Sequence, residues 1–302
     1  MTAILFRSLT IYGAAFLGVG VAIAVMRLRG AARDRPGLTE FEARTLSWMV
    51  LAPLIIIPAY LGGWWLAGVV AFIALQGMRE LLRVTGVNGY GAWASVWVLV
   101  TVLLAQVYPE GFYVIPGFVI ILTSALPVLR KRTSGALYEV GVVVFGLMYL
   151  AWLFARLIFL RAEPGGFGHV VFMGTCVAIN DNASYWAGKL FGRHSRPLIP
   201  EVSPGKTVVG FLGGAAATIG AGLLFHFAIP AVSRAQVLVL ATLIALTGPM
   251  GDLVISVIKR DRGVKDMGTI LPGHGGVLDR FDSILYTTPI YYFALAVLGL
   301  RR

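Results

Sequence analysis

Ten stretches of apolar residues, each close to the length that crosses a lipid bilayer, constrain what this chain can fold into. A spanning helix takes about 20 mostly apolar residues, with roughly 17 to 25 tolerated. The second and third stretches are short and separated only by Gly62 and Gly63, so they could form one re-entrant hairpin. We therefore predict an all-α fold, a polytopic transmembrane helical bundle of about 9–10 spans. The stretches cover residues 4–26, 46–61, 64–78, 92–108, 112–129, 137–160, 168–187, 208–229, 236–257 and 284–300.

The composition excludes an ordinary soluble domain. Hydrophobic residues make up 58% of the chain and charged residues 13%, whereas soluble proteins carry roughly a quarter charged residues. The single cysteine, Cys176, excludes a disulfide within the chain and a thiolate-cluster metal site. The apolar run from Ala3 to Met26, interrupted by Arg7, is too long for the core of a signal peptide. We predict that it is a retained first span.

The positive charges predict an orientation. With the N-terminus outside, most of the 25 Lys and Arg residues fall in inside loops, as the positive-inside rule expects. The exceptions in outside segments are Arg161, Arg234, Arg301 and Arg302. We therefore predict a multi-pass protein of the cell inner (plasma) membrane. The net charge of +11 then reflects topology and membrane lipids as partners, with no nucleic acid.

The polar residues divide the chain into two regions. Residues 1–170 form an N-terminal transmembrane region of about six spans, and residues 171–302 form a C-terminal region that we predict to be catalytic. Its polar loops, 188–207 and 259–283, are both cytoplasmic in this threading, so we expect the active site to face the cytoplasm.

Asp252 lies within the ninth apolar stretch, about 10 Å below the charged residues that follow it. A carboxylate at that depth costs a few kcal/mol, so it needs a partner or a task. Asp252, Ser256 and Lys259 share one face of a helix. A buried aspartate paired with a neighbouring Lys or Arg stays possible. We favour a metal or phosphate role because other groups that bind anions follow at once.

The segment after this helix combines three kinds of residue. Singly, its basic residues are ordinary inside charges, its glycines permit unusual backbone angles, and its aspartates could cap a helix. Together they offer cations for phosphates, carboxylates for a hard metal and glycines for close approach. Oxygen ligands without cysteine indicate Mg²⁺ rather than Zn²⁺. The residues are Lys259, Arg260, Arg262, Lys265, Asp266, Gly273, His274, Gly275, Gly276, Asp279, Arg280 and Asp282.

A second polar segment, residues 180–214, lies upstream. Asp181 lies within the seventh apolar stretch, below Lys189, and shares a helix face with Gly188 and with Ser184 or Tyr185. The turn Ser203-Pro204-Gly205-Lys206-Thr207 opens the next helix, which suggests anion binding at a helix N-terminus. For Gly210 and Gly214 we expect close helix packing. For His169, His194 and His226 we expect structural roles.

These residues resemble the signature of the phosphatidate cytidylyltransferase (CDP-diacylglycerol synthase) family, over about residues 175–295. One difference stands out, because the family usually has Glu where this chain has Val209. The matching positions are Asp181, Tyr185, Gly188-Lys189, Phe191-Gly192, Ser203 to Thr207, Ser256, Lys259-Arg260, Lys265-Asp266, Pro272 to Gly276, Asp279-Arg280 and Asp282.

The resemblance implies condensation of CTP with phosphatidate to give CDP-diacylglycerol and pyrophosphate. It implies Mg²⁺ as cofactor, with a second cation left open. Asp252 and Asp279 are the implied metal ligands, and with Lys259 and Arg260 the implied catalytic residues. The implied substrate-binding residues are Asp181, Lys189, Ser203, Lys206, Ser256, Lys265, Asp266, His274, Gly275, Gly276, Arg280 and Asp282.

Two alternatives stay open. An ion-coupled secondary transporter would explain carboxylates within spans and a helix broken at Gly248-Pro249, but not the dense basic and glycine-rich segment. A cytidylyl- or phosphotransferase for another lipid phosphate or a polyprenol would share every feature. The oligomeric state is also open, since glycine-rich helix faces permit a homodimer.

Overall fold

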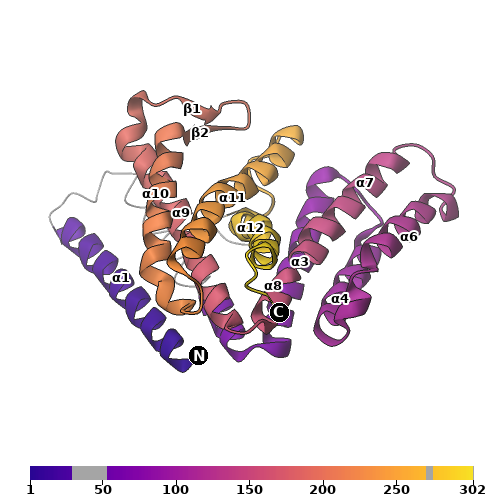
Figure 1. Ribbon diagram of the computed structural model, residues 1–302. Helices are drawn as coiled ribbons and strands as arrows, with labels where there is room; N and C mark the ends of the chain where they lie inside the picture. The colour runs from indigo at the N-terminus through magenta and orange to yellow at the C-terminus, as the bar shows by residue number, and fades with distance from the viewer. Residues whose placement is uncertain (29–52, 270–274, 302) are drawn as a thin grey trace.

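The structure is a computed structural model that describes residues 1–28, 53–269 and 275–301. The predicted site residue His274 lies outside the described residues. Wherever the ten predicted spans fall within these ranges, their residues are mostly helical, as Figure 1 shows. The elements are α1 (Thr2–Leu28), α3 (Gly63–Thr85), α4 (Gly91–Val107), α5 (Pro109–Phe112), α6 (Ile115–Leu129), α7 (Ala136–Gly146), the π-helical η1 (Leu147–Leu153), α8 (Arg156–Ala162), α9 (Gly166–Phe191), the 3₁₀ turn η2 (Gly192–His194), β1 (Pro197–Ile199), β2 (Ser203–Thr207), α10 (Val208–Leu224), the 3₁₀ turn η3 (Phe225–Ala228), α11 (Arg234–Asp261) and α12 (Leu278–Val297).

The lengths of these helices confirm a multi-pass membrane protein. Within the described residues, four helical segments are long and apolar enough to cross a bilayer: Gly63–Thr85, Ala136–Ala162, Val208–Ala228 and Arg234–Asp261. The helices α4 and α6 are apolar but shorter. The predicted spans 168–187 and 284–300 fall in α9 and α12, which are helices outside these four. Both carry polar residues of the candidate site described below.

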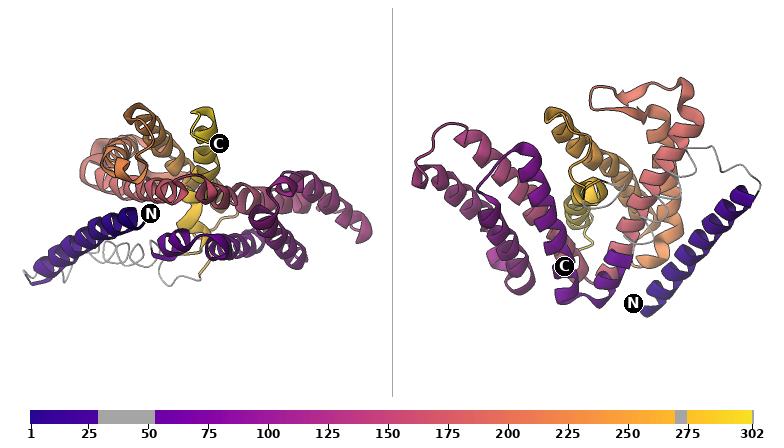
Figure 2. Two further views of the ribbon diagram at one scale, coloured as in Figure 1. Left: turned by 60° about the horizontal axis from the view of Figure 1, so that its bottom comes forward. Right: turned by 180° about the vertical axis from the view of Figure 1, so that it is seen from behind.

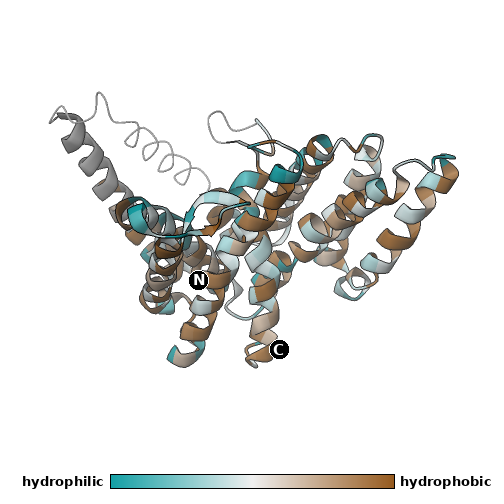
Figure 3. Ribbon diagram, turned by 90° about the horizontal axis from the view of Figure 1, so that it is seen from above, coloured by the Kyte–Doolittle hydropathy of each residue, from teal (hydrophilic) through white to brown (hydrophobic). Residues whose placement is uncertain are grey.

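The charged loops lie at one end of the molecule. The loop between α6 and α7, the hairpin of β1 and β2, and the end of α11 are at the top of Figure 1, whereas both chain ends are at the bottom. Seen from that end, hydrophilic residues gather in the hairpin and at helix ends, and the helix bodies are largely hydrophobic (Figure 3). This arrangement agrees with the charge-based threading, and the cytoplasmic orientation of this end stays a prediction.

Small residues bring α9 and α10 close together. A Cβ atom on Gly210 would lie 2.7 Å from the Ser184 carbonyl oxygen, and one on Gly214 would collide with the Ser184 hydroxyl. Both positions therefore need glycine for packing, as the sequence predicted. The first helix, α1, lies at the edge of the molecule (Figure 2). It contacts the rest through Tyr12, whose ring stacks on Phe225 with centroids 6.1 Å apart.

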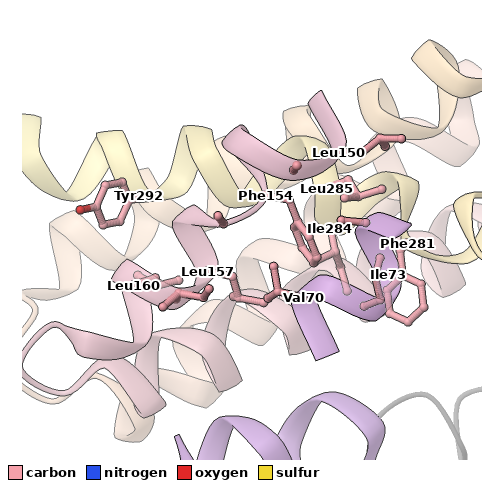
Figure 4. Packing of buried hydrophobic residues seen from close by; sticks show 14 of the residues in the cluster. Val70, Ile73, Leu150, Phe154, Leu157, Leu160, Phe281, Ile284, Leu285 and Tyr292 are labelled. Carbon is pink, nitrogen blue, oxygen red and sulfur yellow. The ribbon is translucent and has the colours of Figure 1, made fainter. Parts of the chain in front are cut away.

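A hydrophobic core joins the N-terminal region to α12. Side chains of α3, of the η1–α8 segment and of α12 interdigitate, as Figure 4 shows. This packing sets α12 against the N-terminal region, although α3 ends at Thr85 and α12 begins only at Leu278. The contacting residues include Val70, Ile73, Leu150, Leu157, Phe281, Ile284 and Leu285.

Two local predictions were wrong. The segment Ser203–Thr207, predicted as a turn, is strand β2, which pairs antiparallel with β1 and adds a small hairpin to an otherwise helical fold. The predicted break at Pro249 is absent, because α11 is continuous through it. Proline lacks the N–H that would bond the carbonyl of Ala245. The Asn180 side chain supplies a donor to that carbonyl instead, at 3.4 Å.

Candidate active site

A cavity of about 550 Å³ lies where α9, the β hairpin, α10, α11 and α12 meet. The two polar segments, far apart in the sequence, form its walls together. Eight of the predicted site residues line it: Asp181, Lys189, Ser203, Lys206, Asp252, Asp279, Arg280 and Asp282. The lining also includes Asn180, Asn182, Ser184, Tyr185 and Gly188 of α9, of which Ser184, Tyr185 and Gly188 belong to the Asp181 face that the sequence predicted.

Asp252 forms one wall of the cavity. Its Oδ2 lies 2.7 Å from Lys206 Nζ, and its Oδ1 accepts a hydrogen bond of 3.1 Å from the Ser256 hydroxyl. Lys206 also donates to the Pro249 carbonyl, at 3.2 Å. The Asp252 side chain is 37% exposed and the Lys206 side chain 25% exposed, so both groups are open to a ligand. The charged partner of this aspartate is thus a lysine of strand β2, whereas its own helix contributes the Ser256 hydroxyl.

Asp279 is more enclosed than Asp252. Its Oδ1 pairs with Lys259 Nζ at 2.8 Å, and its Oδ2 accepts the backbone N–H groups of Met267 at 2.7 Å and Gly276 at 2.9 Å. The two paired side chains are 7% and 11% exposed. A Cβ atom on Gly275, whose φ is 79°, would lie 2.8 Å from Asp279 Oδ2. Gly275 and Gly276 therefore hold the loop against the aspartate.

Two further carboxylates face the cavity. Asp181 Oδ1 accepts a hydrogen bond of 3.3 Å from the Ser283 hydroxyl, and Asp282 Oδ1 accepts the Ser283 backbone N–H at 2.7 Å. Asp282 is buried and lies close enough to Asp181 and Asp252 for charge repulsion. Carboxylates from α9, α11 and α12 thus line the same cavity, and their mutual repulsion favours a cation bound among them.

The other predicted residues lie around this centre. Arg260 Nε donates to the Val202 carbonyl of the hairpin at 3.2 Å, so it connects α11 to that hairpin. Lys189 Nζ lies over the Tyr185 ring, 5.3 Å from its centroid, at the cavity rim. Lys265 and Asp266 are exposed beyond the end of α11. Asp266 also lies beside Gly275, where a Cβ atom would be 3.3 Å from Asp266 Oδ1.

One residue that contacts the signature segment was missed by the sequence analysis. Glu80 of α3 is 1% exposed, and its carboxylate accepts the backbone N–H groups of Val277 at 2.8 Å and Leu278 at 2.9 Å. It lies in the N-terminal region, which the sequence analysis treated only as hydrophobic spans. An acidic side chain between Arg79 and Leu81, just past the predicted span 64–78, was the available signal.

The donor atoms in this cavity fit Mg²⁺. They are hard oxygens from carboxylates, amides and hydroxyls, with no sulfur. Within the described residues, no three Asp, Glu, His or Cys side chains are placed to hold one metal ion together. Mg²⁺ usually takes one or two carboxylates and completes its shell with water and substrate phosphates. Such a site needs no third protein ligand.

The model of the cytidylyltransferase family matches residues 42–298, which is most of the chain. The chain belongs to the cytidylyltransferase family. The chain is 32% identical over 254 residues to the phosphatidate cytidylyltransferase of Staphylococcus epidermidis, covering 82% of this chain and 96% of that protein. It is also 32% identical over 269 residues to the phosphatidate cytidylyltransferase of Brucella suis, covering 86% and 95%. The family resemblance noted in the sequence is thereby confirmed.

Two relatives match over a shorter length. An uncharacterized Escherichia coli protein, YnbB, is 39% identical over 189 residues, which cover 60% of this chain and 61% of that protein. The phosphatidate cytidylyltransferase of Bacillus subtilis is 37% identical over 182 residues, covering 60% and 66%. The chain thus spans under two thirds of the length of these two relatives.

Proposed function

We propose that this protein condenses CTP with phosphatidate, giving CDP-diacylglycerol and pyrophosphate. The observation that carries the proposal is a cavity lined by carboxylates of α9, α11 and α12 and by Lys206, which pairs with Asp252, among helices of a membrane protein. Relatives that share most of their length with this chain are named phosphatidate cytidylyltransferases, which supports the choice of lipid.

The chemistry requires two polyanions to approach each other. An oxygen of the phosphatidate phosphate attacks the α-phosphorus of CTP, and the bond from that phosphorus to the bridging oxygen of pyrophosphate breaks. A phosphate monoester has a second pKa near 6, so the attacking group is largely ionised and needs no strong general base. The protein must therefore offset charge repulsion and hold the reacting atoms in line.

The lysines of the site have this task. Lys206 Nζ and Lys259 Nζ lie 2.7 and 2.8 Å from the carboxylates of Asp252 and Asp279, so each can donate to a phosphate oxygen bound beside its aspartate. Asp252 and Asp279 would hold Mg²⁺, which when bound neutralises phosphate charge and stabilises the leaving pyrophosphate. At Asp279 that ligation competes with Lys259, whereas Asp252 has the more open carboxylate.

The position of the cavity suits a lipid and a nucleotide together. Its lining combines residues of the helices α9, α11 and α12 with residues of the polar β hairpin. We propose that the hairpin faces the cytoplasm of the inner membrane, where CTP enters, and that the lipid headgroup enters between helices. The homodimer considered from the sequence stays a prediction.

A panel of lipid phosphates tests the substrate. Purified protein in lipid nanodiscs receives CTP, Mg²⁺ and either phosphatidate, a polyprenyl phosphate or lysophosphatidate, and the CDP-lipid and pyrophosphate are quantified. We expect one pyrophosphate per CDP-lipid, with phosphatidate preferred by at least about tenfold in kcat/KM, equal to about 1.4 kcal/mol. A preference for polyprenyl phosphate would contradict the proposed substrate but retain the family chemistry. The Asp252→Asn variant is the inactive control.

A further inference from the structure

Glu80 is a fully buried carboxylate of α3 that binds the signature segment at the start of α12. Its Oε1 accepts the Val277 N–H at 2.8 Å, and its Oε2 accepts the Leu278 N–H at 2.9 Å. Both amides belong to the start of α12, and Asp279 is the next residue along the chain. A side chain of the N-terminal region thus lies two peptide units from a central carboxylate of the site.

The start of α12 requires such a partner. The first N–H groups of a helix have no acceptor within the helix, and the helix dipole favours a negative charge there. Val277 occupies the N-cap position and has no side-chain acceptor. The carboxylate of Asp279, in the first turn, accepts instead from Met267 and Gly276. Glu80 therefore supplies from α3 the cap that α12 lacks in its own sequence.

Glycines surround Glu80 where any larger residue would collide with it or with its partners. A Cβ atom on Gly268 would lie 2.7 Å from Glu80 Oε1, and one on Gly276 would lie 2.5 Å from Oε2. On α3 itself, a Cβ atom on Gly77 would lie 2.8 Å from the Leu278 side chain. Three glycines on two segments thus leave space for this carboxylate and for the helix start that it binds.

We propose that Glu80 is a positioning residue, which fixes the turn from Gly275 to Leu278 and thereby the Asp279 carboxylate. Through Asp279 it also holds Lys259, because these two side chains are paired at 2.8 Å. The kinetic part of this inference rests on the proposed function. The structural part, a carboxylate bound to two backbone amides, does not depend on the identity of the substrate.

Hydrogen–deuterium exchange of the purified protein tests the structural part. The Glu80→Gln variant keeps the size of the side chain, but its amide nitrogen faces one of the two N–H groups and cannot accept from it. We expect the Val277 and Leu278 amides to exchange at least about tenfold faster than in the wild type. Peptides from α9 and α10 should exchange unchanged. The control is Arg79→Gln, an exposed neighbour that also loses a charge.

Steady-state kinetics test the positioning part. We expect Glu80→Gln to lose about tenfold in kcat and Glu80→Ala about 100-fold, while KM for the lipid changes less than about threefold. A purely structural role would lower the yield or melting temperature of folded protein, but would leave kcat per folded molecule unchanged. Arg79→Gln should match the wild type in both quantities.

The outcomes separate the two proposals. A wild-type protein that forms no CDP-lipid from any lipid phosphate would contradict the proposed function, and the exchange experiment would still decide the role of Glu80. Unchanged exchange at Val277 and Leu278 in Glu80→Gln would overturn the inference. So would an unchanged kcat per folded molecule in an active enzyme.

Discussion

Asp252 and Asp279 each have a lysine partner within 2.8 Å, yet their surroundings differ. Asp252 faces the cavity with 37% of its side chain exposed, whereas Asp279 is 7% exposed and also accepts two backbone N–H groups. The first carboxylate is therefore suited to bind a ligand directly. The second also holds the loop that precedes α12. Both tasks depend on the negative charge.

Asp252→Asn and Asp279→Asn should each reduce turnover below about 1% of the wild type, because an amide binds a hard cation much more weakly than a carboxylate. Both variants should still reach the membrane in folded form. The measurement is activity across a Mg²⁺ titration at matched amounts of folded protein. Near-normal activity of either variant at low Mg²⁺ would exclude that residue as a metal ligand.

Lys259 and Arg262, three residues apart, should differ in their effect. Lys259 is 11% exposed and pairs with Asp279, whereas Arg262 is 33% exposed and pairs with the exposed Asp261. We expect Lys259→Ala to lose at least about 100-fold in kcat/KM, equal to roughly 2.7 kcal/mol. Arg262→Ala should lose less than about tenfold, because exposed ion pairs contribute little.

Equal losses of kcat/KM in these two variants would mean that the positive charges at the end of α11 attract the substrates without a specific contact. The specific role given to Lys259 would then be wrong. Assays at two ionic strengths add a check, since screening weakens an exposed charge more than a buried pair.

At the level of the elements, the helices could be predicted from the sequence, since a continuous apolar run in a bilayer must form helix. The shared face of Asp252 and Ser256 followed from the same periodicity. The short hairpin of β1 and β2 could not be predicted, because its strands are polar and only three and five residues long. The contact of Glu80 with α12 joins residues 197 positions apart, a distance that no local pattern encodes.

The close packing of α9 on α10 predicts a sharp contrast between two glycines of α10. A Cβ atom on Gly214 collides with Ser184, whereas one on Gly220 has no neighbour within 4 Å. Gly214→Ala should therefore lower the free energy of unfolding by about 1–3 kcal/mol. Gly220→Ala should leave it unchanged or raise it by up to about 1 kcal/mol, because alanine favours helix.

Thermal unfolding in detergent, followed by circular dichroism, measures both variants under one condition. Equal melting temperatures for the two would contradict the packing of α9 against α10.

For the whole molecule, the charged loops at one end predict a single orientation in the membrane. Cysteines at Glu201 and Asp261, in a Cys176→Ser background, should react with an impermeant thiol reagent only from the cytoplasmic side. A cysteine at Ala231, exposed in the loop before α11, should react only from the outside. Labelling of Glu201→Cys from the outside would overturn the charge-based threading.

The central claim, transfer of a cytidylyl group to a lipid phosphate, is tested most directly by the position of a label in CTP. Purified protein is incubated with a lipid phosphate and CTP carrying radioactive phosphorus at either the α or the γ position. The account predicts that the α label appears in the lipid and the γ label in pyrophosphate. The reason is that the bond between the α-phosphorus and the oxygen bridging it to the β-phosphorus is the one that breaks. A γ label in the lipid would show phosphoryl transfer, as by a kinase, and would contradict the account.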